Sequence, residues 1–304
     1  MTMEIGVFAN ITERSVPVDI VATALEARNV ESLFVGEHTH VPVATQPDSY
    51  HNEAVIEFTK NYPAPWILLT AAAAVTKRLK VGTAICLIAQ HEPLVFAKEI
   101  ATLDMISRGR VILGCGYGWN RAELINHGID PGRRRTALRE KLQAVEMLWD
   151  QDIAEFSGEF VSFAPSWSRP KPFQRPRPPV FLGAPATPAL FRDIVELADG
   201  WMPSARFTDE ELAGQISLLR QAAVEAGRPA EELGVVLIEA RATLSSPSIA
   251  HFIDHCPTAE QLLRWRRMGV GRVAIGVPTD TEEKMVASLD HLGDLIEQIS
   301  TSGS

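Results

Sequence analysis

One pattern recurs eight times along this chain: a short apolar run, a glycine or polar break, and a longer segment with helical periodicity. The predicted strands cover residues 3–9, 32–36, 80–88, 110–114, 179–183, 200–203, 234–239 and 271–277. The predicted helices cover residues 17–28, 65–76, 93–106, 133–149, 188–198, 209–226, 259–268 and 281–298. Eight strand–helix units in a chain of 304 residues are typical of a TIM-type (β/α)8 barrel, an α/β fold.

The character of the strands favours the same architecture. Runs such as VGTAICLI, RVILG and RVAIGV are almost continuously apolar, as expected for parallel strands that are covered on both faces. A doubly wound open sheet shows the same alternation, so the order of the elements leaves this alternative open. A dinucleotide-binding fingerprint is poorly matched, because the glycine run at 114–118 follows the fourth strand and Trp119 occupies its third small position.

Two connections are too long for simple turns. Residues 38–64 form a long loop after strand two, rich in His, Asn, Thr and Tyr, and it leaves the strand end that carries active sites in such barrels. Residues 151–178 form an insertion between helix four and strand five, in which FSGEFVSF predicts a hairpin. We interpret residues 1–300 as a single barrel domain and residues 301–304 as a disordered tail.

Composition narrows the class of partner. Lys and Arg number 29 and Asp and Glu number 38, and the resulting net charge of −9 argues against nucleic acid or an anionic membrane as a partner. Three widely spaced cysteines form neither a disulfide scaffold nor a CxxC motif, which is typical of a reducing compartment. No apolar run reaches the length of a membrane span, and MTMEIGVFANITERS shows no export signal, so we expect a cytoplasmic protein.

Three segments that follow strands carry candidate chemistry. Strand two ends in Glu37 and His38, and imidazole is the side chain best suited to exchange protons near neutral pH. The glycine run after strand four exposes backbone amides that a flat ring can approach closely. After strand five, GAPAT at 183–187 leads into a helix and predicts a nest of N–H groups suited to phosphate. A solvated histidine and a plain tight turn are the alternatives for the first two segments.

Other chemistries find less support. GxSxG and GxxxxGK[ST] motifs are absent from the sequence, which disfavours α/β-hydrolase and P-loop functions. Three arginines at 133–135 open a helix, where they either recruit an anion or form solvated surface. We expect no metal site, because no HExxH spacing and no third ligand at a characteristic spacing accompany the histidines considered as ligands, which are His38, His40, His51, His91, His251 and His255.

Three segments together carry a resemblance to a known family. They are SLFVGEHTHVP at 32–42, LKVGTAICLIAQHEPLVFAKEIATLDMISRGRVILGCGYGWNRAEL at 79–124 and PPVFLGAPATPALFRDIVELADGWMPS at 178–204. They resemble the bacterial luciferase-like monooxygenase family, and within it the oxidoreductases that depend on coenzyme F420. The resemblance implies a (β/α)8 barrel with a flavin or deazaflavin ring at the C-terminal strand ends, a long insertion near the middle of the chain and, commonly, a homodimer.

The resemblance also implies roles for individual residues. Glu37 and His38 look like the acid–histidine pair over the reactive edge of the ring, with Glu37 orienting His38. Ala84 and Ile85 fall where the family bulges strand three, often through a non-proline cis peptide. The other implied cofactor contacts are Tyr117, Gly118 and Asn120 after strand four, Gly183, Ala184 and Pro185 at the phosphate, and Ser204 after strand six.

The function that we expect is hydride transfer between bound F420 and a small organic substrate, with His38 exchanging the balancing proton. The first alternative keeps the fold and changes the cofactor to FMN, in a monooxygenase that uses reduced flavin and dioxygen. The alternative of another class is a non-catalytic flavin-binding protein.

Overall fold

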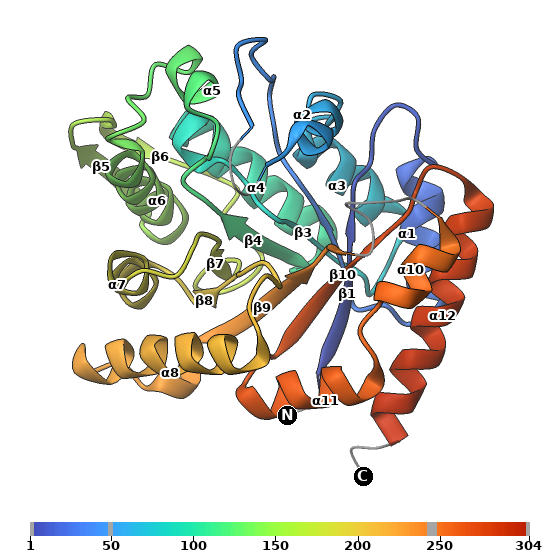
Figure 1. Ribbon diagram of the computed structural model, residues 1–304. Coiled ribbons are helices and arrows are strands. Elements are labelled where there is room, and N and C mark those ends of the chain that lie inside the picture. Colours follow the sequence, from blue (N-terminus) through green and yellow to red (C-terminus); the bar gives the residue numbers. More distant parts are fainter. Residues whose placement is uncertain (1–2, 48–50, 242–247, 302–304) are drawn as a thin grey trace.

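Eight parallel strands close into a barrel in the computed structural model, which describes residues 3–47, 51–241 and 248–301 (Figure 1). Their order around the barrel is β1-β10-β9-β8-β7-β4-β3-β2. The strands are β1 (Glu4–Ala9), β2 (Ser32–Val35), β3 (Lys80–Thr83), β4 (Val111–Cys115), β7 (Val180–Leu182), β8 (Gly200–Trp201), β9 (Gly234–Glu239) and β10 (Arg272–Val277). The closed order confirms the TIM-type fold and excludes the open, doubly wound sheet.

The helices surround this barrel (Figure 1). Eight of them match the predicted helices: α1 (Val18–Ala27), α3 (Pro65–Val75), α4 (Pro93–Ser107), α6 (Arg134–Asp150), α7 (Pro188–Leu197), α8 (Asp209–Glu225), α11 (Ala259–Met268) and α12 (Glu282–Thr301). Three short helices were not predicted: α2 (Glu53–Thr59), α5 (Arg121–Asn126) and α10 (Ile249–His255). The expected tail is corrected at its start, because Thr301 still belongs to α12; residues 302–304 lie outside the described residues.

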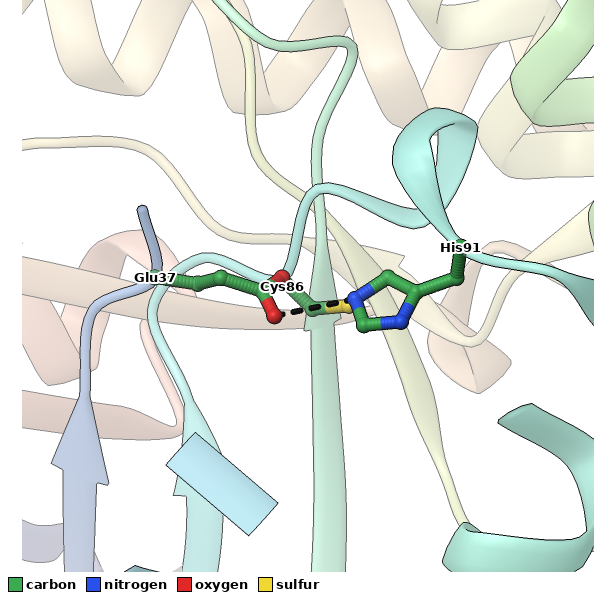
Figure 2. A group of neighbouring side chains, drawn as sticks. All are labelled: Glu37, Cys86 and His91. Carbon is green, nitrogen blue, oxygen red and sulfur yellow. Dashed lines mark hydrogen bonds and ion pairs between the residues drawn. The ribbon is translucent and has the colours of Figure 1, made fainter. Parts of the chain in front are cut away.

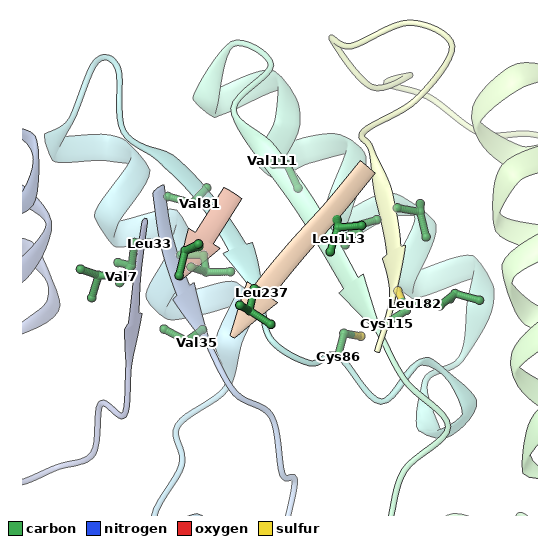
Figure 3. Packing of buried hydrophobic residues seen from close by; sticks show 14 of the residues in the cluster. Val7, Leu33, Val35, Val81, Cys86, Val111, Leu113, Cys115, Leu182 and Leu237 are labelled. Carbon is green, nitrogen blue, oxygen red and sulfur yellow. The ribbon is translucent and has the colours of Figure 1, made fainter. Parts of the chain in front are cut away.

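Side chains alternate along the strands between two buried layers. Phe8, Phe34 and Ile238 belong to a small cluster of residues on the strands or directly after them, inside the barrel. Their neighbours Val7, Leu33 and Leu237 belong to a larger cluster shared with the helices (Figure 3). Because both faces of every strand are covered, the strands read as continuous apolar runs, as the sequence predicted.

The insertion at 151–178 and the predicted strand at 80–88 differ in how well the sequence predicted them. The insertion contains the expected hairpin, with β5 (Ile153–Ser157) antiparallel to β6 (Ser162–Trp167). The predicted strand at 80–88 is too long, because β3 ends at Thr83 and the Ala84–Ile85 peptide is cis. Residues 86–89 are nevertheless fully or almost fully buried, so their apolar character reflects burial rather than strand pairing.

Gly200 in β8 lies directly against the backbone of β9. A Cβ at Gly200 would lie 2.0 Å from the carbonyl oxygen of Gly234. We expect Gly200→Ala to lower the free energy of unfolding by about 1–3 kcal/mol, because this backbone cannot move without disrupting the ladder. Gly214→Ala in α8 is the matched control: a Cβ there meets nothing within 4 Å, and alanine should stabilise the helix by up to about 1 kcal/mol. Urea unfolding measures both, and equal stabilities would contradict the expectation.

Candidate functional site

A cavity of about 240 Å³ lies at the C-terminal ends of the barrel strands. Its floor includes Phe8, Ala84 and Ile238 of the inner cluster, so the packed barrel interior ends where the cavity begins. The lining residues are Phe8, Asn10, Gly36, Glu37, His38, His51, Val55, Thr59, Tyr62, Ala84, Ile85, Leu87, Trp119, Ser204, Ala205, Arg206, Ile238, Ala240 and Arg241. The C-terminal strand ends are the face on which TIM barrels carry active sites.

Two opposite neighbours fix the His38 imidazole on the cavity wall. Its Nδ1 lies 2.7 Å from Oε2 of Glu123, and the indole Nε1 of Trp119 donates to its Nε2 at 3.1 Å. An indole N–H can only donate, so Nε2 is the acceptor and the imidazole proton lies on Nδ1, facing the carboxylate. The network therefore selects one tautomer and points the basic nitrogen toward Trp119, which also lines the cavity.

Glu123 is a functional candidate that the sequence analysis missed. It lies in the first turn of α5 and is completely buried, accepting hydrogen bonds from the backbone N–H of Thr39 and from His38. Asn120 caps this helix, because its Oδ1 accepts from the backbone N–H groups of Ala122 and Glu123. An acidic residue in a first helical turn is a common complement to the helix dipole, so the sequence carried no signal that Glu123 pairs with a histidine.

Glu37 does not contact the imidazole that it was expected to orient. Its Oε1 lies 2.9 Å from Nε2 of His91, and its Oε2 accepts from the backbone N–H of Leu87 at 2.6 Å. Figure 2 shows the Glu37 and His91 side chains facing each other, with Cys86 beside them. The expectation that Glu37 orients His38 is wrong, because consecutive side chains of an extended segment point to opposite sides.

The environment of Glu37 favours its ionised form. Burial alone raises the pKa of this carboxyl group, but the hydrogen bond and charge of His91, together with the Leu87 N–H, outweigh burial and lower its pKa. The Cys86 thiol responds in the opposite direction: its burial, its contact with Cys115 and the nearby Glu37 charge raise its pKa. The site thus combines an ionised carboxylate with a neutral thiol.

The expected cofactor contacts divide into two groups. Ala84, Ile85 and Ser204 line the cavity, and the cis peptide falls at Ala84–Ile85, as the resemblance implied. The other expected contacts lie outside the cavity lining: Tyr117, Gly118, Asn120, Gly183, Ala184 and Pro185. A Cβ at Gly183 would lie 1.6 Å from Cδ1 of Ile85, so the Ile85 side chain covers this glycine.

Tyr117 and Asn120 differ from the expected ring contacts because their side chains are engaged elsewhere. The Tyr117 hydroxyl donates to Oδ2 of Asp193 at 2.6 Å, and burial and this carboxylate raise its pKa. Asp193 also accepts from Arg135, one of the three arginines that open α6. The Asn120 amide donates to Thr45 while its oxygen caps α5. The Tyr117 hydroxyl and the Asn120 amide are therefore hydrogen-bonded within the protein. Any contact of these residues with a ring in the cavity would involve their other atoms.

Two groups of potential metal ligands occur among the described residues. Glu37, Cys86 and His91 form one, and His40, Glu123 and His127 form the other; within each, the ligand atoms lie within 4.8 Å of one another. His40 and His91, two of the histidines considered as metal ligands from the sequence, therefore belong to different groups. His251 and His255 stack on each other with ring centroids 3.9 Å apart. All three cysteines are free and buried.

The fold and the site together define a TIM-barrel protein with a buried histidine, paired with a buried carboxylate, on the wall of a cavity at the C-terminal strand ends. The chain belongs to the luciferase-like monooxygenase family, whose model matches residues 12–251. A curated relative, an uncharacterised protein of Mycobacterium tuberculosis, is 37% identical over 293 residues, covering 95% of this chain and 97% of the relative. None of the helices that the structure describes combines the length and apolar character needed to cross a membrane.

Two solved structures illustrate the breadth of this fold. An F420-dependent secondary alcohol dehydrogenase, in complex with an F420–acetone adduct, has a TM-score of 0.75 at 18% identity. The oxygenating constituent of 3,6-diketocamphane monooxygenase from Pseudomonas putida, in complex with FMN, has a TM-score of 0.75 at 16% identity. Each comparison covers 98% of this chain and 99% of the other. At such identities the likeness establishes a common fold.

Proposed function

We propose that this protein is an oxidoreductase that transfers a hydride between bound coenzyme F420 and a small organic substrate, with His38 exchanging the balancing proton. The observation that carries the proposal is the His38 imidazole on the cavity wall, held through Nδ1 by the buried Glu123. An F420-dependent dehydrogenase among the structural neighbours supports this combination of fold and cofactor.

The lining of the cavity suits a flat ring. Phe8, Ile85 and Ile238 supply apolar surface, while His38 and Trp119 supply a polar edge. The volume of about 240 Å³ is below the roughly 300–1,000 Å³ usual for pockets that enclose a whole ligand. We infer that the cavity takes the ring, and that the chain carrying the phosphate lies outside it. Gly183, Ala184 and Pro185 are the proposed phosphate contacts, with Gly118 beside the chain.

The residues of this chain have distinct proposed roles. The chemistry that a bound deazaflavin supplies is hydride transfer at a ring carbon. His38 takes or gives the proton of the substrate oxygen at Nε2, and that oxygen has to displace the Trp119 N–H from this atom. Glu123 holds the His38 imidazole in place and stabilises the positive charge that forms on this imidazole. Glu37 is a positioning residue, because it ties the end of β2 to Leu87 and His91.

The second candidate function is that of an FMN-dependent monooxygenase, which uses reduced flavin and dioxygen. It is supported by the FMN complex of one structural neighbour and by the description of the matched family. The same cavity and the same histidine serve it. A protein that binds a flavin without catalysis is the remaining alternative.

Titration of the apo protein with F420 and, separately, with FMN tests the proposal by fluorescence. We expect F420 to bind with a Kd of about 1 µM or tighter, and FMN to bind at least about tenfold more weakly. We also expect turnover to proceed without dioxygen, measured by the absorbance change of the deazaflavin. Tighter binding of FMN than of F420, together with turnover that requires dioxygen, would favour the FMN-dependent monooxygenase over the proposed function. Cofactor binding by the wild-type protein without turnover of alcohols or ketones would favour the non-catalytic alternative.

A further inference from the structure

Thr39 is the centre of a hydrogen-bonded network between His38 and the protein surface. Its Oγ1 lies 3.4 Å from Oε1 of Glu123 and 2.7 Å from Nε2 of His127. The same oxygen lies 2.9 Å from Nδ1 of His40. Glu123 and His38 are buried, Thr39 is exposed, and His127 and His40 are half-buried. The network therefore leads from the cavity wall to solvent.

The Thr39 hydroxyl has one proton and more than one possible acceptor. The amide of Asn126 donates to Nε2 of His40, so a neutral His40 carries its proton on Nδ1 and donates it to Thr39. The single hydroxyl proton of Thr39 is then left for one of two acceptors, Oε1 of Glu123 or Nε2 of His127. A hydroxyl that can switch between a buried carboxylate and a surface imidazole can pass a proton between them.

The surface end of the network is suited to release a proton. Burial lowers the pKa of His127, which favours the neutral form of this imidazole. Glu123 has its Oε2 on His38 and its Oε1 on the backbone and hydroxyl of Thr39. Among the described residues, these are the hydrogen-bond partners of its carboxylate, so a proton that leaves His38 through Nδ1 passes by way of Thr39.

We propose that Glu123, Thr39 and His127 form a proton conduit between His38 and solvent. The proposal rests on the proposed function, because it gives the proton that His38 exchanges a route from the cavity wall to solvent. When a substrate alcohol is oxidised, its hydride goes to the cofactor and its hydroxyl proton to Nε2 of His38. The Nδ1 proton of His38 goes to Oε2 of Glu123, and the carboxyl group then turns so that this proton faces Oγ1 of Thr39. Glu123 protonates Thr39 as Thr39 protonates His127, and His127 releases one proton to solvent. The reverse sequence supplies a proton for reduction of a carbonyl.

The conduit can be tested without cofactor or substrate, by following solvent exchange of the His38 Nδ1 proton. A proton shared with a carboxylate resonates at low field in proton NMR, and the signal that His38→Gln removes assigns it. Thr39→Val keeps the backbone bond to Glu123 but lacks the hydroxyl. We expect exchange at least about tenfold slower in Thr39→Val, the equivalent of one lost hydrogen bond, or a signal that is visible only in this variant. Thr39→Ser should restore wild-type exchange.

Two comparisons make the result decisive. His255→Gln removes an exposed imidazole that is not part of the network, so it should leave the exchange of the His38 Nδ1 proton unchanged. Exchange in Thr39→Val that equals the wild-type rate, or a signal too broad to observe in both proteins, would overturn the conduit. Because the measurement needs no turnover, failure of the conduit is distinguishable from failure of the proposed function. With an active protein, Thr39→Val should also lower kcat without changing cofactor affinity, and Thr39→Ser should rescue it.

Discussion

Replacing His38 with alanine is expected to lower turnover about 10²–10⁴-fold, the usual contribution of a general acid or base. Cofactor affinity should change little, because the substitution removes only one polar group from the edge of the cavity and leaves its apolar floor intact. Steady-state kinetics with the preferred cofactor measure the first effect, and fluorescence titration measures the second. A parallel loss of both would point to a damaged site rather than a missing proton carrier.

The companion variants separate chemistry from stability. His38→Ala leaves Oε2 of the fully buried Glu123 carboxylate without its hydrogen-bond partner, which destabilises the fold. His38→Gln keeps a donor for that carboxylate but cannot carry the proton, so it should be as slow as alanine and more stable. His255→Ala, in the exposed part of α10, serves as the control with unchanged turnover. Wild-type turnover in His38→Gln would remove His38 from the mechanism.

Replacing Glu37 with alanine is expected to lower the free energy of unfolding by about 3–5 kcal/mol at neutral pH. The variant leaves the buried N–H of Leu87 and the largely buried imidazole of His91 without their shared partner. Chemical denaturation of both proteins over a range of pH measures the loss. Glu57→Ala is the control, because Glu57 forms an exposed pair with Lys60 at 2.6 Å, and its removal should cost less than about 1 kcal/mol.

The stability difference between wild type and Glu37→Ala should also depend on pH in a defined direction. In the unfolded chain the carboxyl group titrates near its ordinary pKa of 4.5, whereas His91 and Leu87 hold the folded-state pKa lower. The stabilisation is therefore complete above pH 4.5 and is lost as the pH falls through the folded-state value. A difference that is the same at all pH values, or as small as that of Glu57→Ala, would contradict the burial and pairing described for Glu37.

The barrel could be predicted because its pattern is local and repeated. Each strand and helix leaves its own periodicity in the sequence, and glycines mark helix ends because they adopt the left-handed conformation, as Gly109, Gly227 and Gly269 do. The boundary of β3 could not be predicted, since buried residues after Thr83 are as apolar as paired ones. Helix α5 was missed because six residues are too few to show a helical period.

The site was predictable only where a residue type carried its own signal. His38 stood out by its chemistry and by its place after a strand, and the structure puts it on the cavity wall. Its partner Glu123 lies 85 positions away, and no local pattern connects the two. Adjacency in sequence suggested Glu37 instead, although adjacent residues of an extended segment face apart. Long-range pairings of this kind are decided by the fold.

The seam of the barrel has a consequence for how the protein is made. β1 pairs with β10 over six positions, from Glu4 with Arg272 to Ala9 with Val277. While a ribosome is still synthesising the chain, the open edge of β1 has to wait until residues 272–277 emerge. During that interval the nascent chain presents an unpaired strand edge and an incompletely covered interior, both of which invite aggregation. Efficient production in cells should therefore depend on chaperones that shield the early strands until synthesis is nearly complete.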